Sequence, residues 1–152
     1  MKNMIITIAL CSFIFSCASG PVKHGSIKAE LPVTSITFAY NSTEVEDSEL
    51  PEINKTLSAL MNLKDDYFII LEGHTDSEGE NVYNESLALQ RAENVKEILM
   101  GRGIDEAKIK TVSYGEEDLI DVTSFTKKNQ RVNRRVVIEI VRLEKGNNIV
   151  SN

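Results

Sequence analysis

Side chains able to carry chemistry are concentrated in a nine-residue segment, LEGHTDSEG at residues 71–79. His74, Asp76 and Glu78 alternate along it, and this spacing could serve a metal or an acid–base site. The segment ends a predicted strand and precedes a predicted helix, where loops expose backbone N–H groups and ligands collect. We therefore expect a ligand site here.

A buried arginine is predicted on the helix that follows. Arg91 lies four residues after Leu87 and four before Val95, so it falls on the apolar stripe of the helix. An unpaired buried charge is costly, and the guanidinium therefore needs a partner. Two interpretations stay open at this point: an internal salt bridge to Asp76, or a planar group left free to bind a ligand carboxylate.

A second pair of arginines raises the same question near the C-terminus. Arg134 is in phase with Val136 and Ile138 at the start of a predicted strand, whereas Arg135 points to the other face. Taken alone, the pair is most simply two surface arginines whose charged ends reach water.

The other residues of the predicted folded part do not favour a catalytic or metal site at residues 71–79. His74 is the only histidine of the predicted folded part, which also contains no cysteine. A catalytic zinc normally needs three protein ligands, and no serine has a convincing base beside it. We therefore expect that the protein is not an enzyme and that it binds no cofactor or metal. His74 is expected to be structural and to hold its loop through a hydrogen bond.

The elements around these residues alternate between strand and helix. Strands are predicted at residues 35–40, 67–71, 109–114 and 135–141. The run at 67–71 is continuously apolar, which suits a central strand covered on both faces. Val136, Ile138 and Ile140 are predicted to share one face of the last strand.

Two helices are predicted between the strands. The first begins at Ser48 or Glu49 with a proline in its first turn, and the second is capped by Asn81 or Asn84 and ends near residue 100. The apolar stripe of the first helix comprises Leu50, Ile53, Leu57, Leu60 and Met61. Right-handed crossovers place both helices on one face. The predicted fold class is α+β, a two-layer βαβαβ-β domain with a mixed sheet of about four strands.

The N-terminus is similar to a bacterial lipoprotein signal. Lys2 precedes an apolar run at residues 4–15, too short to span a bilayer, and the run ends in Ile-Phe-Ser before Cys17. This resemblance implies cleavage before Cys17 and acylation of its side chain; an ordinary signal peptide cut near Ala18 is the alternative. We predict a signal peptide at 1–16, a lipidated tether at 17–33, a folded domain at 34–143 and a disordered tail at 144–152.

The charge balance argues against nucleic acid as a partner. The chain has 23 acidic and 17 basic residues and a formal net charge of −6, whereas nucleic-acid binders usually carry the opposite sign. The basic cluster at residues 127–135 therefore needs a local explanation.

Several spaced motifs together resemble one known family. They are Gly73-His74-Thr75-Asp76, then Asn84, Leu87, Arg91-Ala92 and Val95, then Ser113-Tyr114-Gly115-Glu116, and finally Asn133-Arg134-Arg135-Val136. Between about residues 36 and 141 the chain is similar to the OmpA-like peptidoglycan-binding domain. Its length and lipidation signal resemble the lipid-anchored branch of that family, the peptidoglycan-associated lipoproteins.

The resemblance implies a role for each site residue. Asp76 and Arg91 would bind the ammonium and the carboxylate at the free end of a diamino acid in the peptidoglycan stem peptide. Arg134 is a further candidate for the carboxylate. Asn84 and Thr75 would shape the pocket through hydrogen bonds, and the loop around Asn41 would lend backbone contacts.

The resemblance also implies a place in the cell. The expected protein is anchored in the outer membrane by lipid on Cys17, faces the periplasm, and tethers that membrane to the cell wall noncovalently. A residue other than aspartate after Cys17 is compatible with export to the outer membrane. Its expected partners are peptidoglycan, membrane lipid and a Tol-system periplasmic protein. The alternatives are a protein-interaction module of a Tol-type complex and a cell-wall hydrolase.

Overall fold

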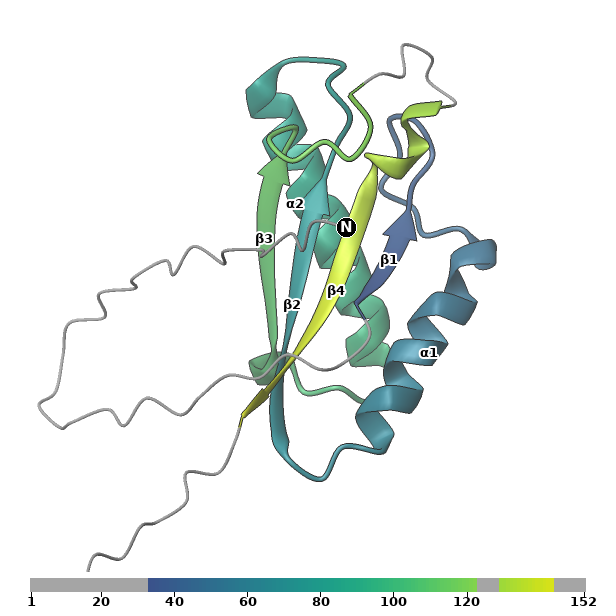
Figure 1. Cartoon of the computed structure of the whole chain (residues 1–152), viewed down its shortest axis with the longest axis vertical. Helices are drawn as coiled ribbons and strands as arrows, with labels where there is room; N and C mark the ends of the chain where they lie inside the picture. Colours follow the sequence, from purple (N-terminus) through teal and green to yellow (C-terminus); the bar gives the residue numbers. More distant parts are fainter. Residues whose placement is uncertain (1–32, 123–128, 144–152) are drawn as a thin grey trace, which may run out of the picture.

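A four-stranded sheet carries two helices on one of its faces (Figure 1). The computed structural model describes residues 33–122 and 129–143. The strands are β1 (Thr34–Thr37), β2 (Asp66–His74), β3 (Ile109–Gly115) and β4 (Arg135–Leu143), and the helices are α1 (Leu50–Met61) and α2 (Asn81–Gly101). Three short 3-10 helices, Asp47–Glu49, Glu106–Lys108 and Asn129–Val132, lie in the connections.

The sheet has the order β1-β4-β2-β3 and is mixed. Strand β4 is antiparallel to both of its neighbours, and β2 is parallel to β3. Helix α1 connects β1 to β2 and α2 connects β2 to β3, so two crossovers build the domain before β4 inserts between the first two strands. The predicted α+β class and the two-layer mixed sheet are confirmed.

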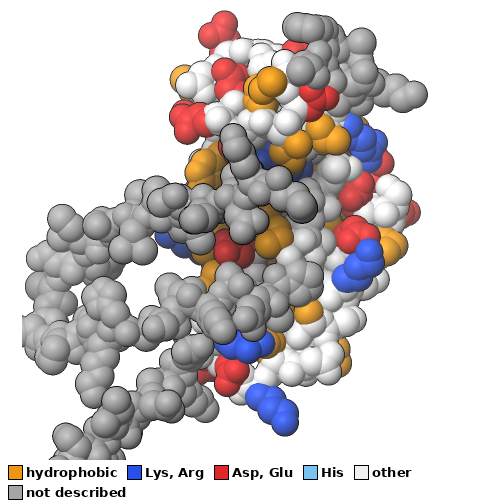
Figure 2. All heavy atoms as spheres, in the orientation of Figure 1, with side chains coloured by type: hydrophobic (Ala, Val, Ile, Leu, Met, Phe, Trp, Pro, Cys, Tyr) orange, Lys and Arg blue, Asp and Glu red, His pale blue; other side chains and the backbone are white. Residues whose placement is uncertain are grey.

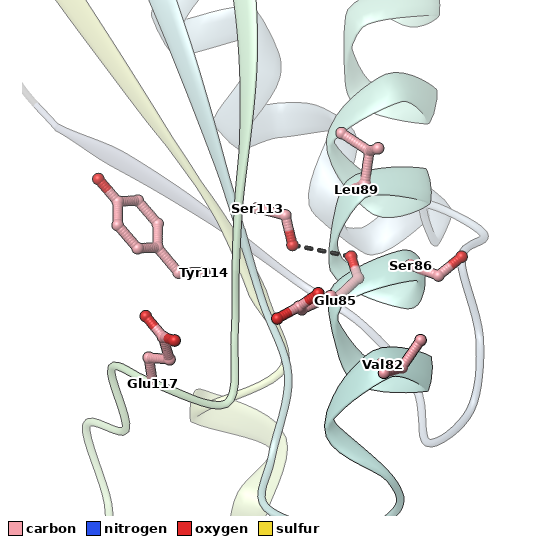
Figure 3. Close-up of a pocket in the computed structure, with 7 residues that line it drawn as sticks. All are labelled: Val82, Glu85, Ser86, Leu89, Ser113, Tyr114 and Glu117. Atoms are coloured by element: carbon pink, nitrogen blue, oxygen red, sulfur yellow. Dashed lines mark hydrogen bonds between the residues drawn. The ribbon is translucent and has the colours of Figure 1, made fainter.

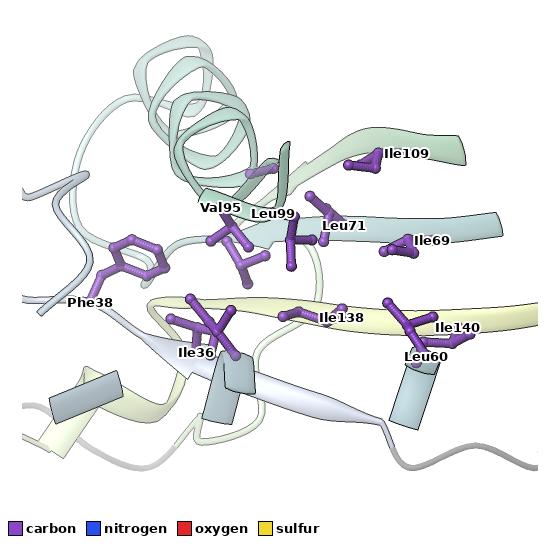
Figure 4. Close-up of a cluster of buried hydrophobic side chains, with 13 residues drawn as sticks. Ile36, Phe38, Leu60, Ile69, Leu71, Val95, Leu99, Ile109, Ile138 and Ile140 are labelled. Atoms are coloured by element: carbon purple, nitrogen blue, oxygen red, sulfur yellow. The ribbon is translucent and has the colours of Figure 1, made fainter. Parts of the chain in front are cut away.

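The core lies between the helices and one face of the sheet (Figure 4). Val136, Ile138 and Ile140 of β4 are all buried in it, as their alternation predicts. They pack with residues from the helices and the other strands, including Ile36, Ile53, Leu60, Ile69, Leu71, Val95 and Leu99.

Helix α2 approaches β2 so closely that a side chain is excluded between them. A Cβ atom on Gly73 would lie 2.0 Å from the carbonyl oxygen of Ala88. This contact is possible only for glycine. It sets the height of α2 above the sheet and therefore the position of every α2 side chain that faces the sheet.

Two sequence expectations about burial are wrong. The second strand is central, but Phe68 is 45% exposed, because neither helix covers the face on which it lies. That face carries a shallow apolar groove of about 490 Å³ lined in part by Phe68, Ile70 and Val141. Met61 is 87% exposed, since it follows the buried Leu60 by about 100° around the last turn of α1.

The predicted signal peptide, Cys17, the tail and all of the tether except Val33 lie outside the described residues. Within 33–122 and 129–143, no helix is both long enough and apolar enough to cross a membrane.

Candidate functional site

A small polar cavity lies where the loops after β1 and β2 meet α2 and the residue that precedes β4. Its volume is about 80 Å³. Five of the predicted site residues line it, namely Asn41, Asp76, Asn84, Arg91 and Arg134. The remaining lining residues are Tyr40, Glu78, Gly79, Tyr83 and Leu87. Residues from four separate parts of the chain thus converge on one point.

Asp76 is held in a buried ion pair. Its Oδ2 accepts a hydrogen bond from Nη1 of Arg134 at 2.9 Å, and both side chains are almost fully buried. Arg134 also donates from Nε to the carbonyl of Phe38 at 3.1 Å. The expectation of two surface arginines is therefore wrong, because the strand phase turns Arg134 into the site.

Arg135 is also buried, on the opposite face, where its Nη2 pairs with Asp118 at 2.9 Å. Arg131, at the other side of the last connection, pairs with Glu46 at 2.8 Å. This pairing lowers the pKa of the Glu46 carboxyl from its usual value. The described part of the basic cluster is thus explained by local ion pairs.

Arg91 is fully buried but is not neutralised by the acid that the sequence suggested. Its Nε donates to the carbonyl of Ser42 at 2.9 Å and its Nη1 donates to the carbonyl of His74 at 3.0 Å. The guanidinium carbon lies 5.3 Å from the centre of the Phe38 ring. The ion-pair partner of Asp76 is Arg134, so the internal Asp76–Arg91 salt bridge is not the arrangement found.

One donor of Arg91 remains unused. Its Nη2 atom is buried and has no hydrogen-bond partner. Burial lowers the pKa of Arg91 to about 10, and the charge of Asp76 opposes that change. Arg91 therefore remains protonated at neutral pH, and a buried cation with a free N–H lines the cavity.

Asn84 belongs to the cavity wall and not to the helix cap. The residue before α2 is Glu80, which makes no side-chain capping hydrogen bond, and Asn81 is exposed. Asn84 is buried and donates to Oε2 of Glu116 at 2.6 Å and to the carbonyl of Asp76 at 3.5 Å. The expected cap is wrong because this side chain faces inward, where it ties α2 to both loops.

Thr75 and Asn41 occupy different places around the cavity. Thr75 is buried and does not line it; its backbone N–H donates to the carbonyl of Gly115 at 2.7 Å, and its hydroxyl has no partner. Asn41 is at the cavity mouth with φ of 51°, and its Oδ1 accepts from the hydroxyl of Tyr83. Sequence reasoning missed Tyr83, which no spacing signal marks, and it considered Glu78 only for a metal or acid–base site and not as a wall of this cavity.

His74 acts through its backbone. Both ring nitrogens are buried without a partner, so the expected side-chain hydrogen bond is wrong. The ring stacks on Tyr114 with centroids 5.3 Å apart, and burial lowers the pKa of the imidazole to about 4. Its carbonyl, however, orients Arg91. Among the described residues, no group of three or more His, Cys, Asp or Glu side chains could hold a metal ion.

Comparisons with known proteins agree on one family. The OmpA family matches residues 37–134. The peptidoglycan-associated lipoprotein of Pseudomonas aeruginosa is 32% identical over 130 residues, covering 82% of this chain and 74% of that protein. The protein of the same name from Buchnera aphidicola is 36% identical over 105 residues, covering 68% of this chain and 59% of that protein.

Solved structures show the same fold. The peptidoglycan-associated lipoprotein from Burkholderia pseudomallei has a TM-score of 0.64 at 26% identity, covering 70% of this chain and 89% of that one. The C-terminal domain of Helicobacter pylori MotB has a TM-score of 0.62 at 23% identity. The match to the outer membrane porin F of Pseudomonas aeruginosa spans only 30% of that protein.

Proposed function

The chain belongs to the OmpA family, and from that premise we propose that it binds peptidoglycan noncovalently through a diamino acid of the stem peptide. Its relatives are named peptidoglycan-associated lipoproteins and outer membrane proteins. The chain is a binding protein and not an enzyme, since the family is one of structural proteins of the cell envelope.

The unused Nη2 donor of Arg91 is the observation that carries this proposal. A buried charged donor without a partner is costly, and a ligand carboxylate would remove that cost. Asp76 stands on the same cavity and can accept from an ammonium group. The free end of diaminopimelate carries one ammonium and one carboxylate on the same carbon, which matches this pair.

The size of the cavity limits what enters it. At about 80 Å³ it is far smaller than the roughly 300–1,000 Å³ of ordinary small-molecule pockets. A glycan strand or a whole stem peptide is too large, whereas the end of one side chain is small enough. Arg134 already pairs with Asp76 and lines the same space, so it would share the incoming carboxylate with Arg91.

The membrane anchor is part of the same proposal and is supported by the sequence. Removal of residues 1–16 and acylation of Cys17 would hold the chain in the outer membrane, with residues 17–33 as a tether, 34–143 as the periplasmic domain and 144–152 as a tail. More than one acyl chain is needed for stable anchoring. Many copies facing a polymeric wall would raise the effective strength of a modest contact. A Tol-system protein is a further proposed partner.

Competition between two stem peptides tests the proposed contact. The full-length chain in detergent is sedimented with peptidoglycan sacculi that contain diaminopimelate. The competitors are L-Ala-γ-D-Glu-meso-diaminopimelate and L-Ala-γ-D-Glu-L-Lys, which differ only by the carboxylate at the side-chain end. A hydrogen bond to a charged group is worth about 1.5–3 kcal/mol, so the lysine peptide should be at least about tenfold weaker.

A matched pair of variants locates the contact. Arg91→Lys keeps the charge but loses the planar fork, so sedimentation should fall. Arg102→Lys makes the same change at an exposed position beyond α2, where Arg102 contacts Asn54, and should sediment like the wild type. Equal competition by the two peptides would show that Arg91 does not bind the carboxylate at the side-chain end. If the wild type stays in solution, peptidoglycan is not the ligand, and a protein-interaction role in a Tol-type complex takes its place.

A further inference from the structure

We propose that a second surface, the groove between α2 and β3, binds an extended and positively charged peptide segment of a partner protein. This surface is separate from the cavity that contains Asp76, so the inference goes beyond the proposed binding of peptidoglycan.

The groove is open and has walls from two elements (Figure 3). Its volume is about 420 Å³, and its lining comprises Val82, Glu85, Ser86 and Leu89 from α2 with Ser113, Tyr114 and Glu117 from β3 and the turn after it. The hydroxyl of Ser113 donates to the carbonyl of Glu85 at 2.8 Å and joins the two walls. The groove is therefore held in shape without a ligand.

Apolar side chains are exposed along this groove. On the α2 wall Val82 is 80% exposed and Leu89 is 42% exposed, whereas the ring of Tyr114, 38% exposed, lies on the other side of β3 (Figure 3), where it stacks on His74. Single exposed apolar residues are ordinary, but a group of them around one groove marks an interaction site. A partner strand along the edge of β3 would cover Val82 and Leu89 on one side and Tyr114 on the other, and this removal of apolar area from water favours binding.

The neighbouring strand favours an extended partner. Within the described residues β3 is an outer strand of the sheet, paired only with β2. An outer strand presents the backbone N–H and C=O groups of alternate residues away from the sheet. An extended peptide can pair with these groups while its side chains alternate between the groove and solvent.

The charge of the groove selects the kind of peptide. Both charged residues of its lining, Glu85 and Glu117, are acidic. Acidic side chains also gather at the end of the molecule where α2 begins (Figures 1 and 2). Two copies of this chain would repel each other, since each has a formal net charge of −6. A partner strand with lysine or arginine next to apolar residues fits better than a second copy.

The groove and the cavity lie on opposite faces of α2. Leu87 and Arg91 line the cavity, whereas Ser86 and Leu89 line the groove. At about 100° per residue, these two sets point away from each other. The peptide segment and a ligand of the cavity could therefore be bound at the same time.

A synthetic peptide tests this proposal with the full-length chain in detergent. The probe is a fluorescent octapeptide of alternating lysine and valine, and its binding is followed by anisotropy. Controls are the glutamate–valine octapeptide and a lysine–valine octapeptide that is N-methylated at every residue, which removes its backbone donors. We expect each control to bind at least about tenfold more weakly than the probe. The glutamate–valine peptide loses the charge-assisted hydrogen bonds, and the N-methylated peptide loses the backbone hydrogen bonds.

Matched variants place the binding in the groove. Glu85→Gln with Glu117→Gln should weaken the probe about fivefold, as expected for two partly exposed charge pairs. Glu44→Gln with Glu97→Gln removes the same charge from exposed positions elsewhere and should leave the affinity within about twofold. Leu89→Lys should also weaken the probe, whereas Arg102→Lys, at an exposed position beyond α2, should not.

The results separate this proposal from that for peptidoglycan, because no wall is present. Equal weakening by both pairs of glutamate variants would mean that only net charge is sensed, and would overturn the groove as the site. Equal binding of the N-methylated probe would overturn strand pairing. The proposed partner would be overturned if the lysine–valine probe did not bind. It would also be overturned if the molecular mass in solution showed that two copies of the chain pair with each other.

Discussion

Substitution of Gly73 by alanine should separate α2 from the sheet. The added Cβ would lie 2.0 Å from the carbonyl oxygen of Ala88 and 2.6 Å from its carbonyl carbon. Real Cβ atoms do not approach closer than about 3.0 Å, so the helix must retreat by at least 1.0 Å (3.0 minus 2.0). Both contacting atoms are backbone, and no rotation of a side chain can relieve the overlap.

The expected loss of stability follows from that retreat. A radial gap of about 0.5–1 Å forfeits a quarter to a half of each dispersion contact, and overpacking alone costs about 1–3 kcal/mol. Since Ala92, Val95 and Leu99 all pack from α2 into the core, we expect the free energy of unfolding to fall by about 3 kcal/mol. Such a change is a large part of the roughly 5–15 kcal/mol of a typical domain.

Urea unfolding followed by circular dichroism measures this change, and Gly101→Ala is the control. Apart from its chain neighbours and the backbone of its own helix, no atom lies within 4 Å of a Cβ at Gly101, the last residue of α2, so alanine should stabilise the chain by up to about 1 kcal/mol. Gly73→Ala should also weaken binding to sacculi, because Arg91 would move relative to the carbonyl of His74 that orients it. A Gly73→Ala protein within about 0.5 kcal/mol of the wild type would refute the reasoning.

Three further predictions concern the buried polar groups and the core. Asp76→Asn should cost about 2–4 kcal/mol in urea unfolding, because it leaves the buried Arg134 without its counter-charge; an unchanged midpoint would contradict this. His74 has a folded-state pKa of about 4, below its ordinary value of 6.5, so the unfolded chain takes up the proton first as the pH falls. Its contribution to stability is complete above about pH 6.5 and is lost between about pH 6.5 and 4, by about 3 kcal/mol in all. His74→Phe should therefore reduce the difference between the free energies of unfolding at pH 7.5 and at pH 4.5. A difference as large as that of the wild type would exclude His74 as its cause. Ile138→Ala should cost about 2–5 kcal/mol, whereas Val137→Ala, on the face without helices, should cost less than about 1 kcal/mol; equal losses would show that the open face is covered.

Local periodicity predicted most of the elements correctly. The alternation of Val136, Ile138 and Ile140 identified the buried face of β4, and the spacing of Ile53 and Leu60 identified that of α1. These patterns succeed because the side-chain direction in a strand or helix depends only on position along that element. The same reasoning failed for Phe68, because an apolar run does not reveal whether one or two layers cover a strand.

The amino-acid sequence by itself determined the order of the elements, the family and the residue types that meet at the cavity. Only the tertiary structure decided how these residues are paired. Arg134 forms an ion pair with Asp76, which lies 58 positions earlier in the chain. The pair forms because β4 inserts between β1 and β2, so that the residue before β4 lies at the cavity. Arg91 is consequently held by two backbone carbonyls and keeps one donor free. Such pairing depends on distances between remote segments, which the spacing of residues along one chain does not encode.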